Sequence, residues 1–153
     1  MSLTADPITG FWGEYRFLSN FFPVDVVLDE EVYPSVEHAY QAAKLSPSDA
    51  AGRDAIRCAA TPGQAKRLGG NAAPRAGWDD MKVGIMRDLL RQKFTRPDLA
   101  ARLLTTGDAD LIEGNSWGDR FWGQSPVGDG ENRLGRLLME IRRDIAEQSR
   151  LLC

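Results

Sequence analysis

Residues that bind metals or form disulfides are scarce in this sequence. The chain of 153 residues has a single histidine, His38, and two cysteines, Cys58 and Cys153, the second of which is the last residue. A structural zinc site needs about four Cys or His ligands at short spacings, and these three residues do not supply them. Because chain ends usually fray, Cys153 is also a poor disulfide partner. We therefore expect neither a structural disulfide nor a Cys/His metal site.

Long apolar stretches are also missing. No run approaches the roughly 20 apolar residues that a membrane-spanning helix needs. The first ten residues, MSLTADPITG, lack the basic start and the apolar core of a signal peptide. We therefore expect a cytoplasmic protein, and a chain of this length is enough for one ordinary domain.

The chain has no excess of positive charge. Its 19 Lys and Arg residues stand against 22 Asp and Glu residues, which gives a net charge of -3 and a pI of about 5.2. Proteins dedicated to duplex DNA usually carry a basic excess. The charge balance therefore favours a small nucleotide, or one modified base, over a long track of phosphates.

The pattern of apolar residues predicts an α+β fold, a mostly helical single domain with a small β element. Residues 24–28 and 31–33 read as a two-stranded hairpin, and residues 111–113 as a further short strand. Apolar residues recurring every three or four positions, together with capping residues, predict helices over residues 36–45, 49–59, 62–70, 78–94, 97–104 and 132–148.

The remaining segments are expected to be flexible ends or loops. We expect residues 1–10 and 149–153 to be flexible and residues 11–148 to form the domain. The segment 114–130 is rich in Gly, Trp and Asp, and its length is typical of a functional loop.

One predicted helix carries polar residues on a face of its own. Glu37, Gln41 and Lys44 are four and three residues apart, so they share a face of helix 36–45 that is distinct from its apolar stripe. At about 1.5 Å per residue, Glu37 and Lys44 lie roughly 10 Å apart along the axis, so one substrate could contact both. A solvated polar face is the alternative, and the helix dipole alone would favour a carboxylate at position 37. His38 is expected to be structural.

Lys82 and two loops are the other candidates. Lys82 falls on the apolar stripe of helix 78–94, where it must either reach solvent or line a pocket and hold a phosphate. Residues 113–123 include two tryptophans and a phenylalanine that either cap the core or stack on a planar ligand. Asp119 lies among them, where it either takes part in acid–base chemistry or stabilises a turn. Residues 128–135 enter the last helix through glycines, a pattern that can bind an anion.

These motifs occur in the same order in one protein family. From Phe11 to Ile145 the sequence resembles the NADAR (YbiA-like) family. The residues that carry the resemblance are Phe17-Leu18-Ser19-Asn20-Phe21 with Pro23, Tyr33-Pro34, Glu37-His38-Ala39-Tyr40-Gln41-Ala42 with Lys44, Trp78 with Lys82 and Met86, Lys93-Phe94, Leu104 with Thr106, Leu111 with Glu113, Asp119, Trp122-Gly123, Gly130, Asn132, Leu134-Gly135, Leu138-Met139 and Arg142.

The resemblance implies a fold and an activity. The fold is the family's helical α+β domain, and the activity is hydrolysis of an N-glycosidic bond to ribose, without a metal or redox cofactor. The substrate would be a ribosylated phosphate intermediate of the riboflavin pathway, or ADP-ribose linked to guanine in DNA or RNA. The second substrate would fit a neighbouring ADP-ribosyltransferase in a toxin–antitoxin pair. A non-catalytic module that binds NAD or ADP-ribose is the alternative.

The resemblance also implies roles for particular residues. Glu37 and Asp119 would form the catalytic carboxylate pair, which stabilises charge on ribose C1 and activates water. Lys44 would hold a phosphate, protonate the leaving group or form a Schiff base with an opened ribose. The substrate-binding residues would be Ser19, Asn20, Phe21, Gln41, Arg75, Lys82, Trp122, Gly123, Gly130 and Asn132, of which the aromatic rings would stack on the base and the asparagines would bond ribose hydroxyls.

Two positions depart from the family pattern. Gly69-Gly70 stands where the family usually has Gly-Arg, and Gly77 stands where an Asp often precedes the Trp. We expect a substrate-phosphate contact to be lost or to have moved to Arg75, and either change would affect the choice of substrate more than the type of reaction.

Overall fold

The computed structural model describes residues 5–152, so the expectations for residues 1–4 and for Cys153 lie outside the described residues. Contacts divide the chain into two compact units. We call Asn20–Lys93 the central unit, because it is the middle of the sequence. The terminal unit consists of the described parts of Met1–Ser19 and Phe94–Cys153. Throughout residues 5–152, each helix is too short or too polar to cross a lipid bilayer.

A two-stranded hairpin opens the central unit. β1 (Pro23–Leu28) pairs antiparallel with β2 (Glu31–Ser35). The two residues of the turn, Asp29 and Glu30, have φ values of 48° and 70°, the handedness that matches a tight turn to the twist of its strands. Arg53 donates a 2.7 Å hydrogen bond to the Asp29 carboxylate, which holds the turn in this strained conformation.

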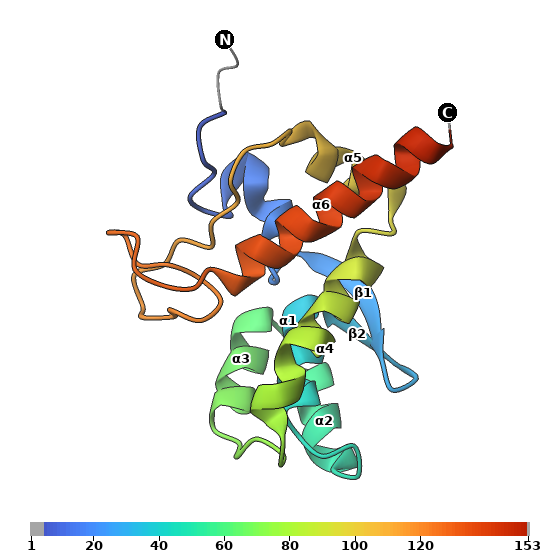
Figure 1. The fold of residues 1–153 in the computed structure, drawn as a ribbon. Coiled ribbons are helices and arrows are strands. Elements are labelled where there is room, and N and C mark those ends of the chain that lie inside the picture. The colour runs from blue at the N-terminus through green and yellow to red at the C-terminus, as the bar shows by residue number, and fades with distance from the viewer. Residues whose placement is uncertain (1–4, 153) are drawn as a thin grey trace. The chain divides into compact units, whose positions relative to one another are not determined.

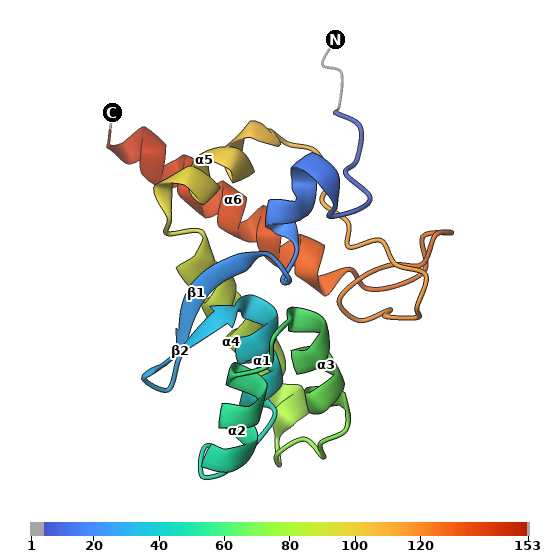
Figure 2. The same cartoon turned by 180° about the vertical axis from the view of Figure 1, so that it is seen from behind.

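The helices of the central unit are α1 (Val36–Ala43), α2 (Ala50–Arg57), α3 (Pro62–Gly70) and α4 (Trp78–Lys93). The first three begin at capping residues, because the side chains of Ser35, Asp49 and Thr61 each accept a bond from the backbone N–H three residues further on. α1 contacts α2, α3, α4 and both strands (Figures 1 and 2). As a result, all eight residues of α1 are buried.

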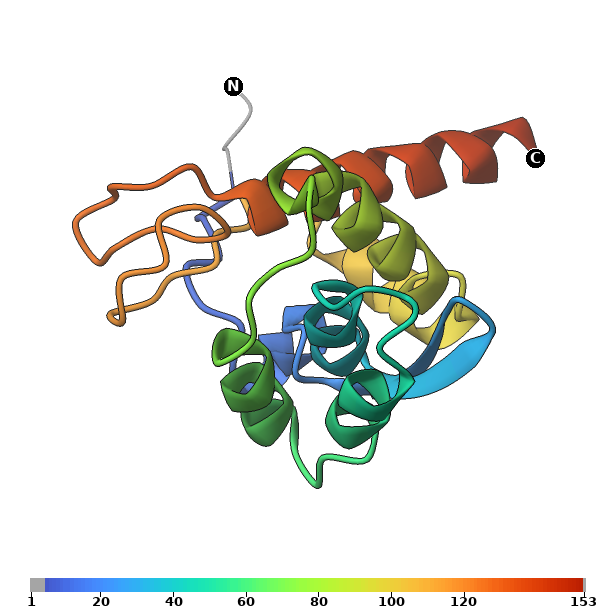
Figure 3. The same cartoon turned by 90° about the horizontal axis from the view of Figure 1, so that it is seen from below.

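The terminal unit contains a 3-10 helix, η1 (Gly13–Leu18), and two α-helices, α5 (Pro97–Thr105) and α6 (Arg133–Leu151). α6 is a single long helix (Figure 3) that packs against α5. Arg142 of α6 donates a buried 2.9 Å bond to the Thr106 hydroxyl at the end of α5. This bond links the middle of α6 to the end of α5.

The predicted fold class, both strands of the hairpin and all the predicted helices are confirmed. Three segments differ from prediction. Residues 111–113 form no strand, because the pairing is limited to one bridge between Leu111 and Ile8. Ile8 is buried, and the flexibility of residues 1–10 stays a prediction. α6 continues to Leu151, three residues beyond its predicted end, and η1 forms where we predicted no regular element.

Candidate active site

The side chain of Glu37 lies inside the central unit, with 7% of its surface exposed. Gln41, one turn further along α1, donates a 2.8 Å bond from Nε2 to Glu37 Oε1. The backbone N–H of Glu37 donates to the carbonyl of Asn20 at 3.1 Å. A carboxylate buried without donors is strongly destabilised, so the bond from Gln41 helps to accommodate the charge, while the backbone bond fixes the start of α1 against Asn20. The predicted shared face of Glu37 and Gln41 is confirmed, and the alternative of a solvated face is wrong.

Two amide oxygens next to Glu37 are buried without a protein partner. Within residues 5–152, Asn20 Oδ1 and Gln41 Oε1 have no hydrogen bond. The Asn20 amide nitrogen contacts Met86 Sδ at 3.6 Å, which orients the side chain. An unpaired buried acceptor costs about 1–3 kcal/mol, and a ligand that supplies an O–H or N–H donor removes that cost. Asn20 and Gln41 therefore suit a hydroxyl-rich ligand.

Helix α3 determines the position of the Gln41 side chain. A Cβ atom at Gly69 would overlap Gln41 Oε1 and would lie 2.8 Å from Gln41 Cδ. Real Cβ atoms essentially never come so close, so only glycine allows α3 to pack here. Gly69 lies within α3, near its end, and sets the geometry of Gln41.

Lys44 follows the last residue of α1 and is half-buried. Burial lowers the pKa of Lys44, the nearby carboxylate of Glu37 raises it, and repulsion from Lys66 and Lys82 lowers it further. The Lys44 ammonium also lies 5.8 Å from the centroid of the Tyr40 ring. A lysine with a lowered pKa gives up its proton more readily than an exposed lysine, which suits acid–base or nucleophilic chemistry.

Further cations come close to the same end of α1. Lys66 of α3 and Lys82 of α4 are near enough to act on the pKa of Lys44. The Lys82 side chain is 19% exposed, and its ammonium bonds Asp79 Oδ1 at 3.1 Å near the surface. The backbone N–H of Arg75 donates to the carbonyl of Lys44 at 2.7 Å, which ties the loop before α4 to α1. Positive side chains from α1, α3 and α4 thus form what we call the lysine cluster (Lys44, Lys66 and Lys82), an arrangement that suits phosphate oxygens.

In the terminal unit, Asp119 organises the aromatic loop. Its Oδ1 accepts bonds from the backbone N–H groups of Phe121 (3.2 Å) and Trp122 (2.9 Å). The Asn115 side chain bonds both the N–H and the carbonyl of Asp119. The turn-stabilising role that the sequence left open is therefore present, and a catalytic role for Asp119 stays a prediction. The rings of Phe121 and Trp122 meet edge to face, with centroids 4.8 Å apart.

The turn before α6 uses several of its N–H groups within the protein. Four consecutive N–H groups, from Glu131 to Leu134, donate to carbonyl oxygens of the loop 120–123 at 2.7–3.2 Å. These four groups are not free for an anion, and a phosphate site at this helix end stays a prediction. Asn132 has φ 49°, and its amide bonds the N–H of Glu113 at 3.0 Å and the carbonyl of Leu111 at 2.9 Å. These bonds hold the chain on both sides of the loop.

Comparison with known proteins shows the family of this chain. The NADAR domain pattern matches residues 10–146. The chain belongs to the NADAR domain family. The resemblance read from the sequence is therefore confirmed.

Several NADAR relatives cover most of the chain. An N-glycosidase of Nostoc punctiforme is 41% identical over 138 residues, covering 88% of this chain and 88% of that protein. A riboflavin biosynthesis protein of Vibrio vulnificus is 38% identical over 138 residues, which is 88% of this chain and 37% of that longer protein. The NMR structure of the Escherichia coli protein YbiA matches with a TM-score of 0.80 and 36% identity, covering 96% of this chain and 89% of that chain.

The predicted site residues of this NADAR chain divide between the two units. His38, as expected, is structural, since its ring bonds Ser35 Oγ at 2.7 Å and the carbonyl of Ala59 at 3.0 Å. The central unit holds Asn20, Phe21, Glu37, Gln41, Lys44, Arg75 and Lys82, and the terminal unit holds Ser19, Asp119, Trp122, Gly123, Gly130 and Asn132.

Proposed function

We propose that this NADAR chain is an N-glycosidase that hydrolyses the bond between a base or amine and C1 of a phosphorylated or ADP-linked ribose. Membership of the NADAR family, and relatives named N-glycosidase, support hydrolysis of N-glycosyl compounds. One observation carries the proposal: the buried Glu37 carboxylate lies beside two unpaired amide oxygens, on the helix that also leads to the lysine cluster.

The chemistry of the reaction matches these groups. As the bond between C1 and nitrogen breaks, positive charge builds on the sugar, and its electron pair leaves with the nitrogen. The Glu37 carboxylate stabilises that charge and accepts a proton from the water that attacks C1. The bond from Gln41 favours the ionised carboxylate, while the unpaired oxygens of Gln41 and Asn20 accept hydrogen bonds from ribose hydroxyls.

Lys44 is proposed to serve the other end of the substrate. Its ammonium donates a proton to the departing nitrogen or, with Lys66 and Lys82, binds phosphate oxygens. The products are a ribose that carries a hydroxyl at C1 and a base or amine that carries the added proton. The roles of Asp119 and Trp122 rest on the family resemblance alone, and Asp119→Asn in the same assay tests the first of them.

A ribosylamino phosphate of the riboflavin pathway is the first candidate substrate. One NADAR relative is named a riboflavin biosynthesis protein. The net charge of -3 also favours a small metabolite over a nucleic acid.

ADP-ribose linked to guanine is the second candidate. The observation in its favour is the lysine cluster, because several ammonium groups suit the pyrophosphate of an ADP-ribose. An unpaired or flipped base needs few basic contacts, so the acidic pI does not argue against this substrate. An ADP-ribosyltransferase encoded by a neighbouring gene would be the matching partner, because it would attach the ADP-ribose that this enzyme removes.

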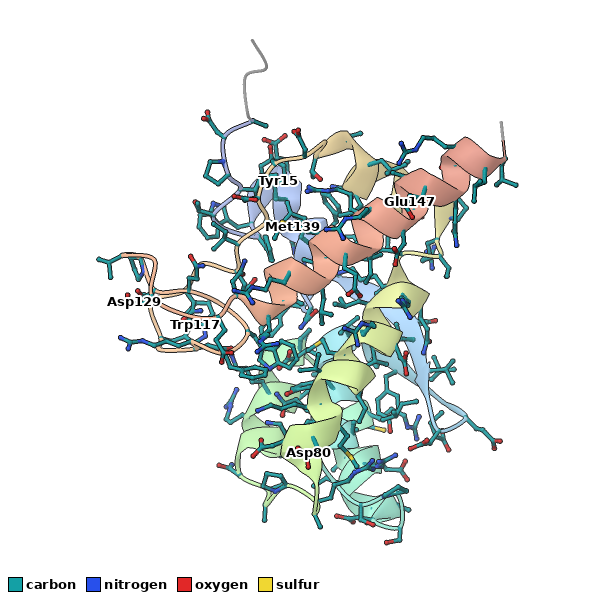
Figure 4. All side chains as sticks on the ribbon, viewed as in Figure 1. Tyr15, Asp80, Trp117, Asp129, Met139 and Glu147 are labelled. Atoms are coloured by element: carbon teal, nitrogen blue, oxygen red, sulfur yellow. The ribbon has the colours of Figure 1, made fainter. Side chains whose placement is uncertain are left out.

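Mass spectrometry of the products from both substrates tests the proposal. Glu37→Gln should lower turnover by about 100-fold or more. Glu147→Gln makes the same change of charge at an exposed position of α6 (Figure 4) and should leave turnover unchanged. Release of ribose phosphate from the metabolite alone would identify the first substrate, and release of ADP-ribose from the oligonucleotide the second. Full turnover by folded Glu37→Gln would refute the mechanism, and tight ADP-ribose binding without cleavage would indicate a non-catalytic module.

A further inference from the structure

A separate pocket lies wholly within the terminal unit. Its volume is about 710 Å³, within the range of roughly 300–1,000 Å³ that small-molecule sites occupy. Thr9 and Trp12 line it from the N-terminal segment, and Trp117, Gln124 and Val127 line it from the long loop before α6. None of the residues assigned above to catalysis or substrate binding is among its lining residues.

Backbone hydrogen bonds hold the floor of this pocket in place. The N–H of Ile112 donates to the carbonyl of Ile8 at 2.9 Å. The N–H of Asn115 donates to the carbonyl of Gln124, and the N–H of Gln124 to the carbonyl of Glu113, both at 2.9 Å. Three chain segments are thereby joined side by side, so the pocket is formed before any ligand arrives.

Two exposed tryptophans border the pocket. Trp12 is 67% exposed and Trp117 is 64% exposed (Figure 4 shows Trp117 on the loop). The Trp12 ring lies over Gly10, since a Cβ there would overlap the indole. Large aromatic rings are usually well buried, and two accessible indoles at one pocket are suited to stacking on a planar ligand.

The polar lining limits what kind of planar ligand fits. All twelve lining residues lie within the described chain, and none of them is charged. A bare phosphate or an acidic peptide would find no cation here. Thr9, Ser116 and Gln124 do supply hydroxyl and amide groups, which can bond the edge of a ring that carries its own donors and acceptors. An uncharged heteroaromatic ring with a polar edge matches both features.

We propose that this pocket binds a nucleobase, stacked on Trp12 and Trp117 and bonded at its edge by Gln124 and the neighbouring hydroxyls. The base belongs either to a free nucleotide or to an unpaired position of a single strand, and its sugar and phosphate stay outside the uncharged pocket. The proposal does not depend on the glycosidase activity, because it uses none of the proposed catalytic residues.

NMR of a ¹⁵N-labelled Glu37→Gln protein tests the pocket directly. The spectrum contains one indole N–H signal for each tryptophan, and Trp→Phe variants assign the signals to Trp12, Trp78, Trp117 and Trp122. AMP should shift the signals of Trp12 and Trp117, while that of buried Trp78 stays in place. Ribose 5-phosphate, which has the sugar and phosphate without the base, should shift neither pocket signal. The Glu37→Gln background keeps catalysis out of the measurement, so binding and glycosidase activity can fail separately.

Variants set the size of the effect. Trp117→Ala should weaken AMP binding by about 5- to 150-fold, since stacking on an aromatic side chain contributes about 1–3 kcal/mol. Trp117→Phe should retain most of the affinity, and Leu68→Ala, at an exposed apolar position of α3, should bind as the parent protein does.

Two probes separate the sources of the base. An oligonucleotide of five deoxyadenosines that binds more than tenfold tighter than AMP would indicate a single strand, and equal binding would indicate a free nucleotide. Any of three results would overturn the proposal. AMP and ribose 5-phosphate could cause equal shifts, AMP could leave the Trp12 and Trp117 signals unmoved, or Trp117→Ala could bind AMP with unchanged affinity.

Discussion

The contact between Gly69 and Gln41 makes a specific prediction about α3. In Gly69→Ala, the new Cβ would overlap Gln41 Oε1 and lie 2.8 Å from Gln41 Cδ. Either α3 moves away from α1 or Gln41 leaves its position. In both cases the bond from Gln41 Nε2 to the Glu37 carboxylate is lost or lengthened.

The magnitude follows from a comparison with the neighbouring glycine. Gly70 is also in α3, but nothing lies within 4 Å of where its Cβ would be. Both Gly→Ala changes gain about 0.5–1 kcal/mol of helix propensity, so their difference isolates the overlap. Overpacking costs about 1–3 kcal/mol, which corresponds to a Tm about 2–12 °C lower in Gly69→Ala than in Gly70→Ala.

Activity should fall together with stability in Gly69→Ala. A hydrogen bond to a charged group contributes about 1.5–3 kcal/mol, so kcat should drop by about 10- to 150-fold. Gly70→Ala should keep the parent kcat. Adding Gln41→Ala to Gly69→Ala removes Gln41 Oε1 and Cδ but keeps Gln41 Cβ, which would also lie 2.8 Å from the new Cβ. The double variant should therefore recover part of the stability and none of the kcat. If Gly69→Ala and Gly70→Ala have the same Tm and the same kcat, α3 does not position Gln41 and the reasoning is wrong.

Three further predictions concern stability, each measured by urea unfolding. Ser35→Ala removes the cap that accepts the N–H of His38 and should cost about 1–2 kcal/mol; an unchanged midpoint would contradict that role. Burial lowers the pKa of Lys44 below 10.5, so between the lowered pKa and 10.5 the unfolded chain binds more protons than the folded chain. The folded protein therefore becomes more stable as pH rises through this window, because the cost of burying the ammonium, which is present at lower pH, disappears. Any stability that Lys44→Met gains over the parent should therefore shrink as pH approaches 10.5, and a gain independent of pH would be evidence against the shift. Asn132→Ala loses both amide bonds and leaves an alanine at φ 49°, so it should lower the free energy of unfolding by about 2–4 kcal/mol. Asn132→Gly should lower it less, because glycine tolerates this conformation. Equal losses in the two variants would show that backbone strain is unimportant there.

Local patterns predicted most of the fold. Ser35 and Thr61 cap the helices that the sequence predicted to start after them, because capping depends on residues only three positions apart. Asp49, predicted as the first residue of its helix, is the cap of α2. The hairpin was predicted from the short stretch 24–28 and the turn at Asp29 and Glu30, which are equally local. The segment 111–113 was mispredicted as a strand, because a strand needs a partner of matching length and the chain supplies only Ile8.

The candidate site was predicted in part. The spacing of Glu37, Gln41 and Lys44 correctly placed Glu37 and Gln41 on one face of α1, since the helix period determines which side chains are neighbours. The same reasoning could not identify Gly69, whose importance comes from a contact between two helices. It also predicted an anion site before α6, which stays a prediction, and it did not predict that carbonyl groups of the loop 120–123 accept four N–H bonds there.

The sequence by itself determined the helices and hairpin, the family, and the identity of the polar residues on α1, because all of these depend on short-range spacing or on the order of motifs. Only the tertiary structure decided that the polar face of α1 is enclosed instead of solvated. Burial of Glu37 and Gln41 depends on α2, α3, α4 and both strands packing around one helix. The same packing leaves two amide oxygens unpaired and lowers the pKa of Lys44, because desolvation and missing partners are properties of the whole assembly of elements and are absent from any single helix.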